Sequence, residues 1–240
     1  MSAFPVTSNT HRINRWAILL IVTVTTEIGL LFWHFIPAGL PMLSLAQILP
    51  VSEKLSWYLT RSSGTVGYLT LTLSTVWGLL LSTKLVKAWV PPALALMMHN
   101  SLAWIAVGLS FFHAFVLLFD SYYPYTVANL LVPFTGPYAP QWVGVGTISF
   151  YLLLLVSASF YGRRWIGARL WRRLHYLTFA AFMMVTLHGW MAGTDSTQLR
   201  PMYLVSGGLV LFLTLYRIID AVQSRRASQP TNNDPLFQLS

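Results

Sequence analysis

The stretch WRRLHYLTFAAFMMVTLHG, residues 171–189, decides the fold. After a basic start it runs as one apolar segment with a histidine near each end, His175 and His188, thirteen residues apart. An earlier apolar segment repeats the arrangement with His99 and His113, fourteen residues apart. At a rise of about 1.5 Å per residue, each pair spans ~20 Å of helix, which is most of the ~30 Å hydrocarbon core of a bilayer. Two such helices side by side would offer one pair of histidines at each of two depths in a membrane.

The composition indicates a membrane protein. Of 240 residues, 55% are hydrophobic and 9% are charged, and the mean hydropathy is +0.61. A soluble domain carries roughly 25% charged residues, so this chain could not cover its surface in water. The net charge of +9 comes from basic residues that lie between apolar segments. That distribution is typical of membrane topology, and it argues against a nucleic-acid partner.

The apolar runs predict an all-α integral membrane protein with a bundle of six transmembrane helices. A cytoplasmic segment, 1–15, precedes the bundle, which occupies 16–222, and a disordered cytoplasmic tail follows at 223–240. The six spans are expected at about 16–36, 62–82, 93–119, 142–161, 174–191 and 202–219.

Several features outside the histidine segments also carry expectations. The residues between the first two spans, 37–60, are expected to form an exposed loop that can hold a short interfacial helix. The pair Arg200-Pro201 is expected to lie in a turn before the last span. Glu27 lies in the middle of the first span, where a hydrogen-bonded packing residue is favoured over a proton-handling group. The second span has small residues for close helix contact, namely Gly64, Gly67, Thr70, Ser74 and Gly78.

The distribution of Lys and Arg predicts the orientation of the spans. With both termini in the cytoplasm, only Lys54, Arg61 and Arg200 lie outside. The other twelve lie inside: Arg12, Arg15, Lys84, Lys87, Arg163, Arg164, Arg169, Arg172, Arg173, Arg217, Arg225 and Arg226. This asymmetry follows the positive-inside rule at every loop. The third and fifth spans then run in the same direction, so His99 pairs in depth with His175, and His113 with His188.

Two pairs of intramembrane histidines suggest a cofactor. A lone histidine in a membrane helix is usually an interior hydrogen-bonded residue, but here position, spacing and topology agree for four of them. Two neutral imidazoles are the ligands that a low-spin b-type haem needs, whereas the absence of cysteine excludes covalent c-type haem attachment. One flaw remains in the geometry. At 100° per residue, fourteen residues bring His113 within ~40° of the face of His99, but thirteen leave His188 ~140° from the face of His175. Helix tilt, supercoiling or a π-bulge would have to absorb that difference.

Several motifs together resemble the ferric reductase-like transmembrane domain, over roughly residues 55–220. They are WYLTRSSG at 57–64, the segment from His99 to His113, LVPF at 131–134, WRRLH at 171–175 and HGWMAGTD at 188–195. That superfamily includes ferric reductases, NADPH oxidases and the haem subunit of the bacterial methionine sulfoxide reductase system. Spacings of fourteen and thirteen between the histidines are a feature of the family.

The resemblance implies two haem b groups per chain, between the third and fifth helices. His99 and His175 would ligate the inner haem iron, and His113 and His188 the outer one. Haem propionates are anionic, so Arg61, Arg172 and Arg173 are candidate contacts for the cofactor. For Arg61 we favour propionate contact or a role at the acceptor site over interfacial anchoring. For Arg172 and Arg173, propionate contact and ordinary positive-inside anchoring are equally good interpretations.

The expected function is transmembrane electron transfer by an oxidoreductase component. No G-x-G-x-x-G turn or flavin motif is present, so we expect a separate flavoprotein or membrane quinol as donor. Ferric iron, dioxygen or an extracytoplasmic protein is the expected acceptor. Two alternatives stay open: a haem subunit that delivers electrons to an extracytoplasmic oxidoreductase, as in the methionine sulfoxide reductase system, and a non-redox scaffold or carrier that has kept the fold. The expected location is a bacterial plasma membrane, as a multi-pass protein surrounded by lipid.

Overall fold

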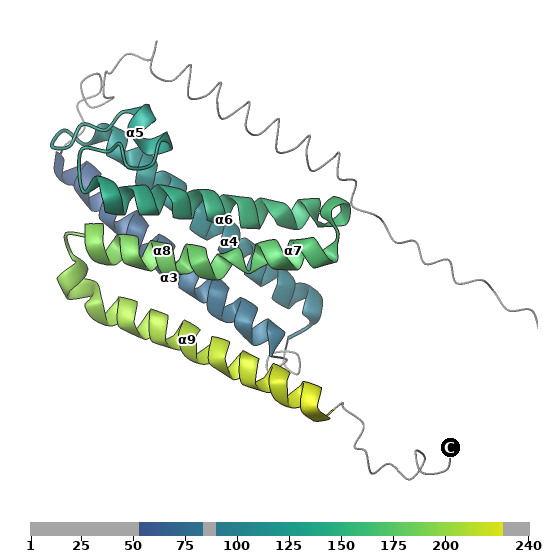
Figure 1. Cartoon of the computed structure of the whole chain (residues 1–240). Helices are drawn as coiled ribbons and strands as arrows, with labels where there is room; N and C mark the ends of the chain where they lie inside the picture. The colour runs from purple at the N-terminus through teal and green to yellow at the C-terminus, as the bar shows by residue number, and fades with distance from the viewer. Residues whose placement is uncertain (1–52, 84–89, 228–240) are drawn as a thin grey trace, which may run out of the picture. The chain divides into compact units, whose positions relative to one another are not determined.

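The computed structural model describes residues 53–83 and 90–227, which all belong to one compact unit, 43–240. Every regular element within these residues is helical. In chain order the elements are α3 (Glu53–Ser82), α4 (Pro92–Val116), the 3₁₀ turn η1 (Leu117–Phe119), α5 (Val127–Leu131), α6 (Pro140–Ile166), α7 (Ala168–His175), α8 (Leu177–Ala192) and α9 (Ser196–Ala227). The long helices lie side by side, and α7 continues the line of α8 (Figure 1).

Proline and glycine mark the helix ends. Helix α4 has Pro92 in its first turn, where the missing N–H costs nothing and the fixed φ suits a helix. Between α6 and α7, Gly167 has a φ of +80°, which a residue with a Cβ rarely adopts. Its N–H donates to the Arg163 carbonyl, and its own carbonyl accepts from Trp171. One glycine therefore ends α6 and starts α7.

Four helices are long and apolar enough to cross a membrane within the described residues, covering Lys54–Ser82, Pro92–Phe119, Pro140–Ile166 and Ser196–Ser224. They contain the predicted second, third, fourth and sixth spans. The predicted fifth span corresponds to the end of α7 and to α8, which has 16 residues and is by itself shorter than the ~20 residues that a span needs. The predicted first span and Glu27 lie outside the described residues.

Three predicted boundaries were wrong. Helix α3 begins at Glu53, inside the expected loop, because neither proline nor glycine interrupts the chain between Glu53 and Gly64. Pro201 lies within α9 and not in a turn, since near the start of a helix its missing N–H leaves a single carbonyl without its usual donor. Helix α9 also continues to Ala227, beyond the predicted start of the tail at 223.

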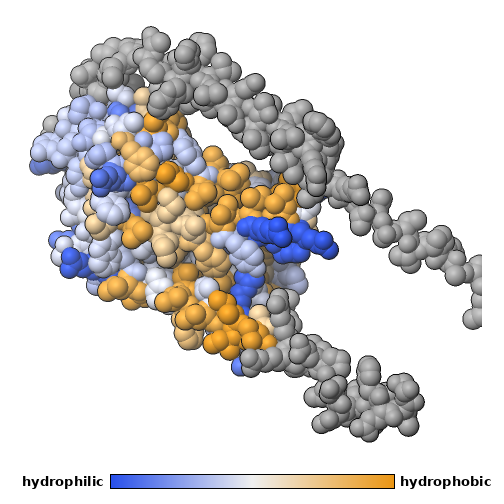
Figure 2. All heavy atoms as spheres, in the orientation of Figure 1, coloured by the Kyte–Doolittle hydropathy of each residue, from blue (hydrophilic) through white to orange (hydrophobic). Residues whose placement is uncertain are grey.

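The bundle has a small apolar interior and an apolar exterior. Buried side chains from α3, α4, α6, α8 and α9 form one cluster: Tyr68, Leu71, Leu79, Ala106, Val107, Leu153, Ala181, Phe182, Tyr203, Val210 and Leu213. Large hydrophobic side chains are nonetheless exposed along every long helix, and Figure 2 shows them gathered on α9 and α6. A soluble monomer rarely exposes so much contiguous apolar surface, so this is the exterior of a helical membrane protein.

The segment from 120 to 139 is held together at one end of the bundle (Figure 1). The Asp120 carboxylate accepts the backbone N–H groups of Tyr122 and Tyr123. Thr126 and Asn129 form a reciprocal capping box at the start of α5. The hydroxyl of Tyr138 donates to the Ala192 carbonyl at the end of α8, over 3.1 Å. These contacts fix the segment beside the end of α8, where the candidate site opens.

Candidate functional site

Two histidines from separate helices meet at each of two levels in the bundle. The ring centroids of His99 on α4 and His175 at the end of α7 are 6.1 Å apart, with 74° between the ring planes. Those of His113 on α4 and His188 on α8 are also 6.1 Å apart, with 80° between the planes. The structure therefore brings together the same partners that the charge distribution pairs in depth. We call the first pair the inner pair and the second the outer pair.

The pairing fixes the relative direction of the helices. The first histidine of α4 meets the first histidine of the α7–α8 segment, and the second meets the second. The two segments must therefore run in parallel. This is the relation expected for the third and fifth spans of the predicted topology.

A break after His175 bears on the awkward thirteen-residue spacing. Tyr176 separates α7 from α8, and its carbonyl accepts the N–H of Phe179 over 3.2 Å. That is an i−3 bond, typical of the tighter 3₁₀ turn with about 120° per residue. Thirteen residues at 100° stop ~140° short of four full turns, and extra winding reduces this offset. At this position the structure shows a local break, and no π-helix occurs among the described residues.

Three of the four rings are oriented by backbone carbonyls. The Nδ1 of His99 lies 3.0 Å from the Ser74 carbonyl oxygen, and that of His113 lies 2.7 Å from the Thr60 oxygen. The Nδ1 of His188 lies 2.9 Å from the Trp142 oxygen. A carbonyl can only accept, so each Nδ1 carries the proton and each Nε2 keeps its lone pair.

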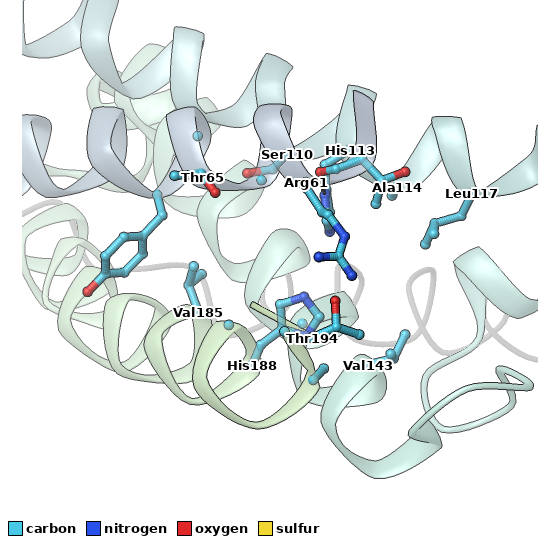
Figure 3. A pocket seen from close by; sticks show the side chains of 18 of the residues that line it. Arg61, Thr65, Ser110, His113, Ala114, Leu117, Val143, Val185, His188 and Thr194 are labelled. Carbon is cyan, nitrogen blue, oxygen red and sulfur yellow. Dashed lines mark hydrogen bonds between the residues drawn. The ribbon is translucent and has the colours of Figure 1, made fainter. Parts of the chain in front are cut away.

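A cavity of about 840 Å³ contains the outer pair. Figure 3 shows the side chains of His113, His188 and Arg61 extending toward it, with the two histidines on opposite walls. The deeper lining is apolar or small, and the mouth is polar and aromatic, including Lys54, Trp57, Tyr58, Asp120, Tyr122 and Tyr123. Its volume is within the ~300–1,000 Å³ typical of cofactor pockets, and apolar walls with a few placed polar groups are typical of such sites.

The histidine pairs fit a metal held between two imidazoles. A nitrogen–metal bond of about 2 Å and about 1.1 Å from that nitrogen to the ring centre would separate two opposed ring centres by about 6 Å. The observed separation is 6.1 Å at both levels. No group of three or more His, Asp or Glu suited to a bare metal ion occurs among the described residues. A haem needs only two protein ligands, because the porphyrin supplies the other four.

Arg61 is a cation at the outer cavity. Its guanidinium lies 3.6 Å above the centre of the Trp57 ring and forms an ion pair with Asp195, in the turn between α8 and α9. The side chain is 21% exposed, so most of it is out of water. Arg61 is therefore a partly buried cation that lines the same cavity as His113 and His188. Sequence reasoning named Arg61 but not its partner Asp195.

The inner pair has a further basic neighbour besides the two arginines that the sequence indicated. Arg172 and Arg173 are exposed on α7, and within the described part of the chain neither forms a hydrogen bond or ion pair. Arg217 on α9 instead lies 5.8 Å from the Tyr176 ring and interacts electrostatically with His175. In the sequence, Arg217 is distinguished only as one of the basic residues that set the topology. No local pattern marks it, because its position beside His175 depends on how α9 packs.

Trp171 also belongs to the inner level. Its ring stacks on that of His175, with centroids 5.3 Å apart and 25° between planes. Its indole Nε1 is buried without a hydrogen-bond partner among the described residues. A buried N–H without an acceptor is costly, so an anionic group at this level would satisfy it.

No protein-family model, curated protein or solved structure matches the chain. This chain's own residues and their geometry are therefore the basis for its function.

Proposed function

We propose that this protein is a ferric reductase-like transmembrane cytochrome that carries electrons across a bilayer through two bis-histidine b-type haems. The observation that carries the proposal is the pair of neighbouring imidazoles at each of two levels, with the same centroid separation of 6.1 Å. The levels are about 20 Å apart along the helix, so one cofactor at each would bridge most of the hydrocarbon core.

The protein's own groups would hold and tune the cofactors. His99 and His175 would ligate the inner haem iron, and His113 and His188 the outer one. Haem b supplies a reversible one-electron couple when it is bound. The Nδ1 bonds orient the rings and raise the donor strength of Nε2. Two protein ligands per iron leave no open coordination position, so an acceptor would be reduced without binding the iron.

Charged groups at the two levels support the same proposal. Arg61 would balance the outer propionates and would also be available to an anionic acceptor at the cavity mouth. At the inner level we assign the corresponding role to Arg217 in preference to Arg172 and Arg173, because Arg217 is the arginine that interacts with His175.

The proposal includes a membrane topology and electron-transfer partners. Six spans in a bacterial plasma membrane, with both termini in the cytoplasm, would place the inner pair near the cytoplasm, in agreement with the positive-inside distribution. A separate flavoprotein or membrane quinol would supply the electrons. Ferric iron, dioxygen or an extracytoplasmic oxidoreductase would accept them.

A reduced-minus-oxidised spectrum and a haem assay on purified protein test this function. We expect b-type bands and about two haems per chain. His99→Ala and His175→Ala should remove one haem component, and His113→Ala and His188→Ala should remove the other. A colourless protein purified from haem-replete cells would refute the proposal. Loss of one component by both His99→Ala and His188→Ala would contradict the parallel arrangement.

A further inference from the structure

The carbonyls that orient three of the histidines share one relation to glycine. His113 bonds to the carbonyl of Thr60, four residues before Gly64, and His99 bonds to that of Ser74, four residues before Gly78. On α6, His188 bonds to the carbonyl of Trp142, four residues before Gly146. The same offset therefore occurs at three places on two helices.

The close approach depends on the missing Cβ of each glycine. A Cβ added at Gly64 would lie 2.8 Å from the Nδ1 of His113, and one at Gly146 would lie 2.7 Å from the Nδ1 of His188. A Cβ at Gly78 would lie 2.9 Å from the Cε1 of His99. Each of these separations is shorter than real Cβ contacts allow, so the ring would have to move.

Helix geometry explains why the offset is four. The carbonyl oxygen of residue i−4 accepts the N–H of residue i, and the side chain of residue i covers the turn on its N-terminal side. When residue i is glycine, that carbonyl is open to a second donor from a neighbouring helix, and an oxygen has two lone pairs to accept both. We call this arrangement a glycine socket.

The sockets on α3 match the histidines on α4 in register. Gly64 and Gly78 are fourteen residues apart, as are His99 and His113. Because Gly64 faces His113 and Gly78 faces His99, the two helices are antiparallel and stay in register over both levels.

His175 has no such socket. Gly146 faces His188, and the position of the antiparallel helix α6 that returns nearest to the same face at the level of His175 is Phe160, fourteen residues further on, which is not a glycine. Within the described residues the His175 ring forms no hydrogen bond, and it stacks on Trp171 instead. The outer pair is thus held by two sockets and the inner pair by one.

We propose that Gly64, Gly78 and Gly146 are positioning residues for the haem ligands. Each glycine leaves a helix carbonyl accessible, and that carbonyl fixes the ring plane and the tautomer of one histidine. Both histidines of the outer haem site are then anchored in this way, but only one histidine of the inner site is. This inference rests on the proposed haem function. It assigns the two sites different ligand strengths, because a histidine that donates its Nδ1–H to a carbonyl is a stronger donor to the metal.

Alanine substitution at each socket, compared with Gly108→Ala, tests the inference. Gly108 lies on α4 between the two histidines, and a Cβ there would meet nothing within 4 Å, so its variant is the matched control. Spectroelectrochemical titration of each purified variant would follow the two haem components separately. Gly64→Ala and Gly146→Ala should each shift one and the same component to higher potential or deplete it. Gly78→Ala should affect the other component, and Gly108→Ala neither.

Unchanged potentials and haem content in well-folded socket variants would overturn the inference, as would an effect of all three variants on the same component. A wild-type protein without haem would instead overturn the proposed function, so the two failures are distinguishable. If the socket variants do not fold, wild-type protein labelled with ¹⁵N-histidine decides the question, since reduced low-spin haem iron is diamagnetic. Slowly exchanging Nδ1–H signals from three axial histidines, but not from His175, are expected. Rapid exchange at all four would refute the sockets.

Discussion

Alkaline pH should release the segment that packs at the mouth of the outer cavity, and Tyr125 is the group responsible. Its side chain is only 2% exposed, and its hydroxyl donates to the Tyr138 carbonyl over 3.4 Å. Burial is the main cause that raises the pKa of Tyr125 to about 12, compared with about 10 for an unfolded tyrosine. The folded state therefore favours the protonated hydroxyl. Its contribution to stability is complete below pH 10 and disappears as the pH rises toward 12.

The magnitude follows from the size of the shift. A shift of two pKa units is equivalent to ~2.7 kcal/mol in the free energy of unfolding, of which about 2 kcal/mol is lost between pH 10 and pH 12 and the rest at the two ends of the titration. The matched variant is Tyr125→Phe, which keeps the ring but cannot ionise. At pH 8 it should cost less than about 1 kcal/mol, because the hydrogen bond that it removes is long.

Thermal unfolding in detergent, measured from pH 8 to pH 12 for both proteins, checks this prediction. The other ten tyrosines titrate in both proteins, so the difference between the two curves isolates Tyr125. We expect wild type to be the more stable protein at pH 8 and the Phe variant to be the more stable one near pH 12. Parallel curves across the whole range would refute the assigned burial of the hydroxyl.

Three substitutions should change stability through separate contacts, each measured by unfolding in the same detergent. Arg61→Gln should cost about 1 kcal/mol, because it removes the partly exposed ion pair with Asp195 and the contact with an aromatic ring; no loss would mean that the ion pair does not hold α3 to the α8–α9 turn. Thr126→Ala should cost about 1 kcal/mol through loss of the α5 cap, seen as faster amide exchange at Asn129, and unchanged exchange would contradict the capping box. Phe182→Ala should cost ~3–5 kcal/mol, because the side chain is 6% exposed in the core, and a loss below 1 kcal/mol would place it outside that core.

The partners within each histidine pair could be predicted because they depend on periodic features of the sequence. The length of the apolar runs locates the helices, and the alternation of basic loops gives each helix a direction. Direction and depth together leave His175 as the partner of His99, and His188 as that of His113. The structure has these neighbours, although the haems that they are proposed to bind stay a prediction.

Other parts of the site depend on packing and carry no local signal. Arg217 and Asp195 are ordinary charges in the sequence. They join the site only because α9 packs against α3 and α8 and because the α8–α9 turn reaches Arg61 on α3. The break at Tyr176 was not predicted, since no proline or glycine marks it. The glycines of α3 were recognised as small residues for close contact. Their fourteen-residue spacing, equal to that of His99 and His113, was the available signal for a more specific role.

The difference between the inner and outer sites can be traced to a single residue of spacing. Fourteen residues of helix return to within ~40° of the starting face. The two glycines of α3 and the two histidines of α4 are each fourteen residues apart, so each histidine of α4 can face a glycine of α3. The two histidines of the α7–α8 segment are thirteen residues apart, and a break beside His175 helps to turn both of them toward α4. The face of α6 that offers Gly146 to His188 offers Phe160 fourteen residues later, so no glycine opens a carbonyl to His175 there. Under the proposed function, His175 is the ligand that no glycine socket anchors and that stacks on Trp171, so the inner site is the one whose ligand field should respond most to changes in that ring.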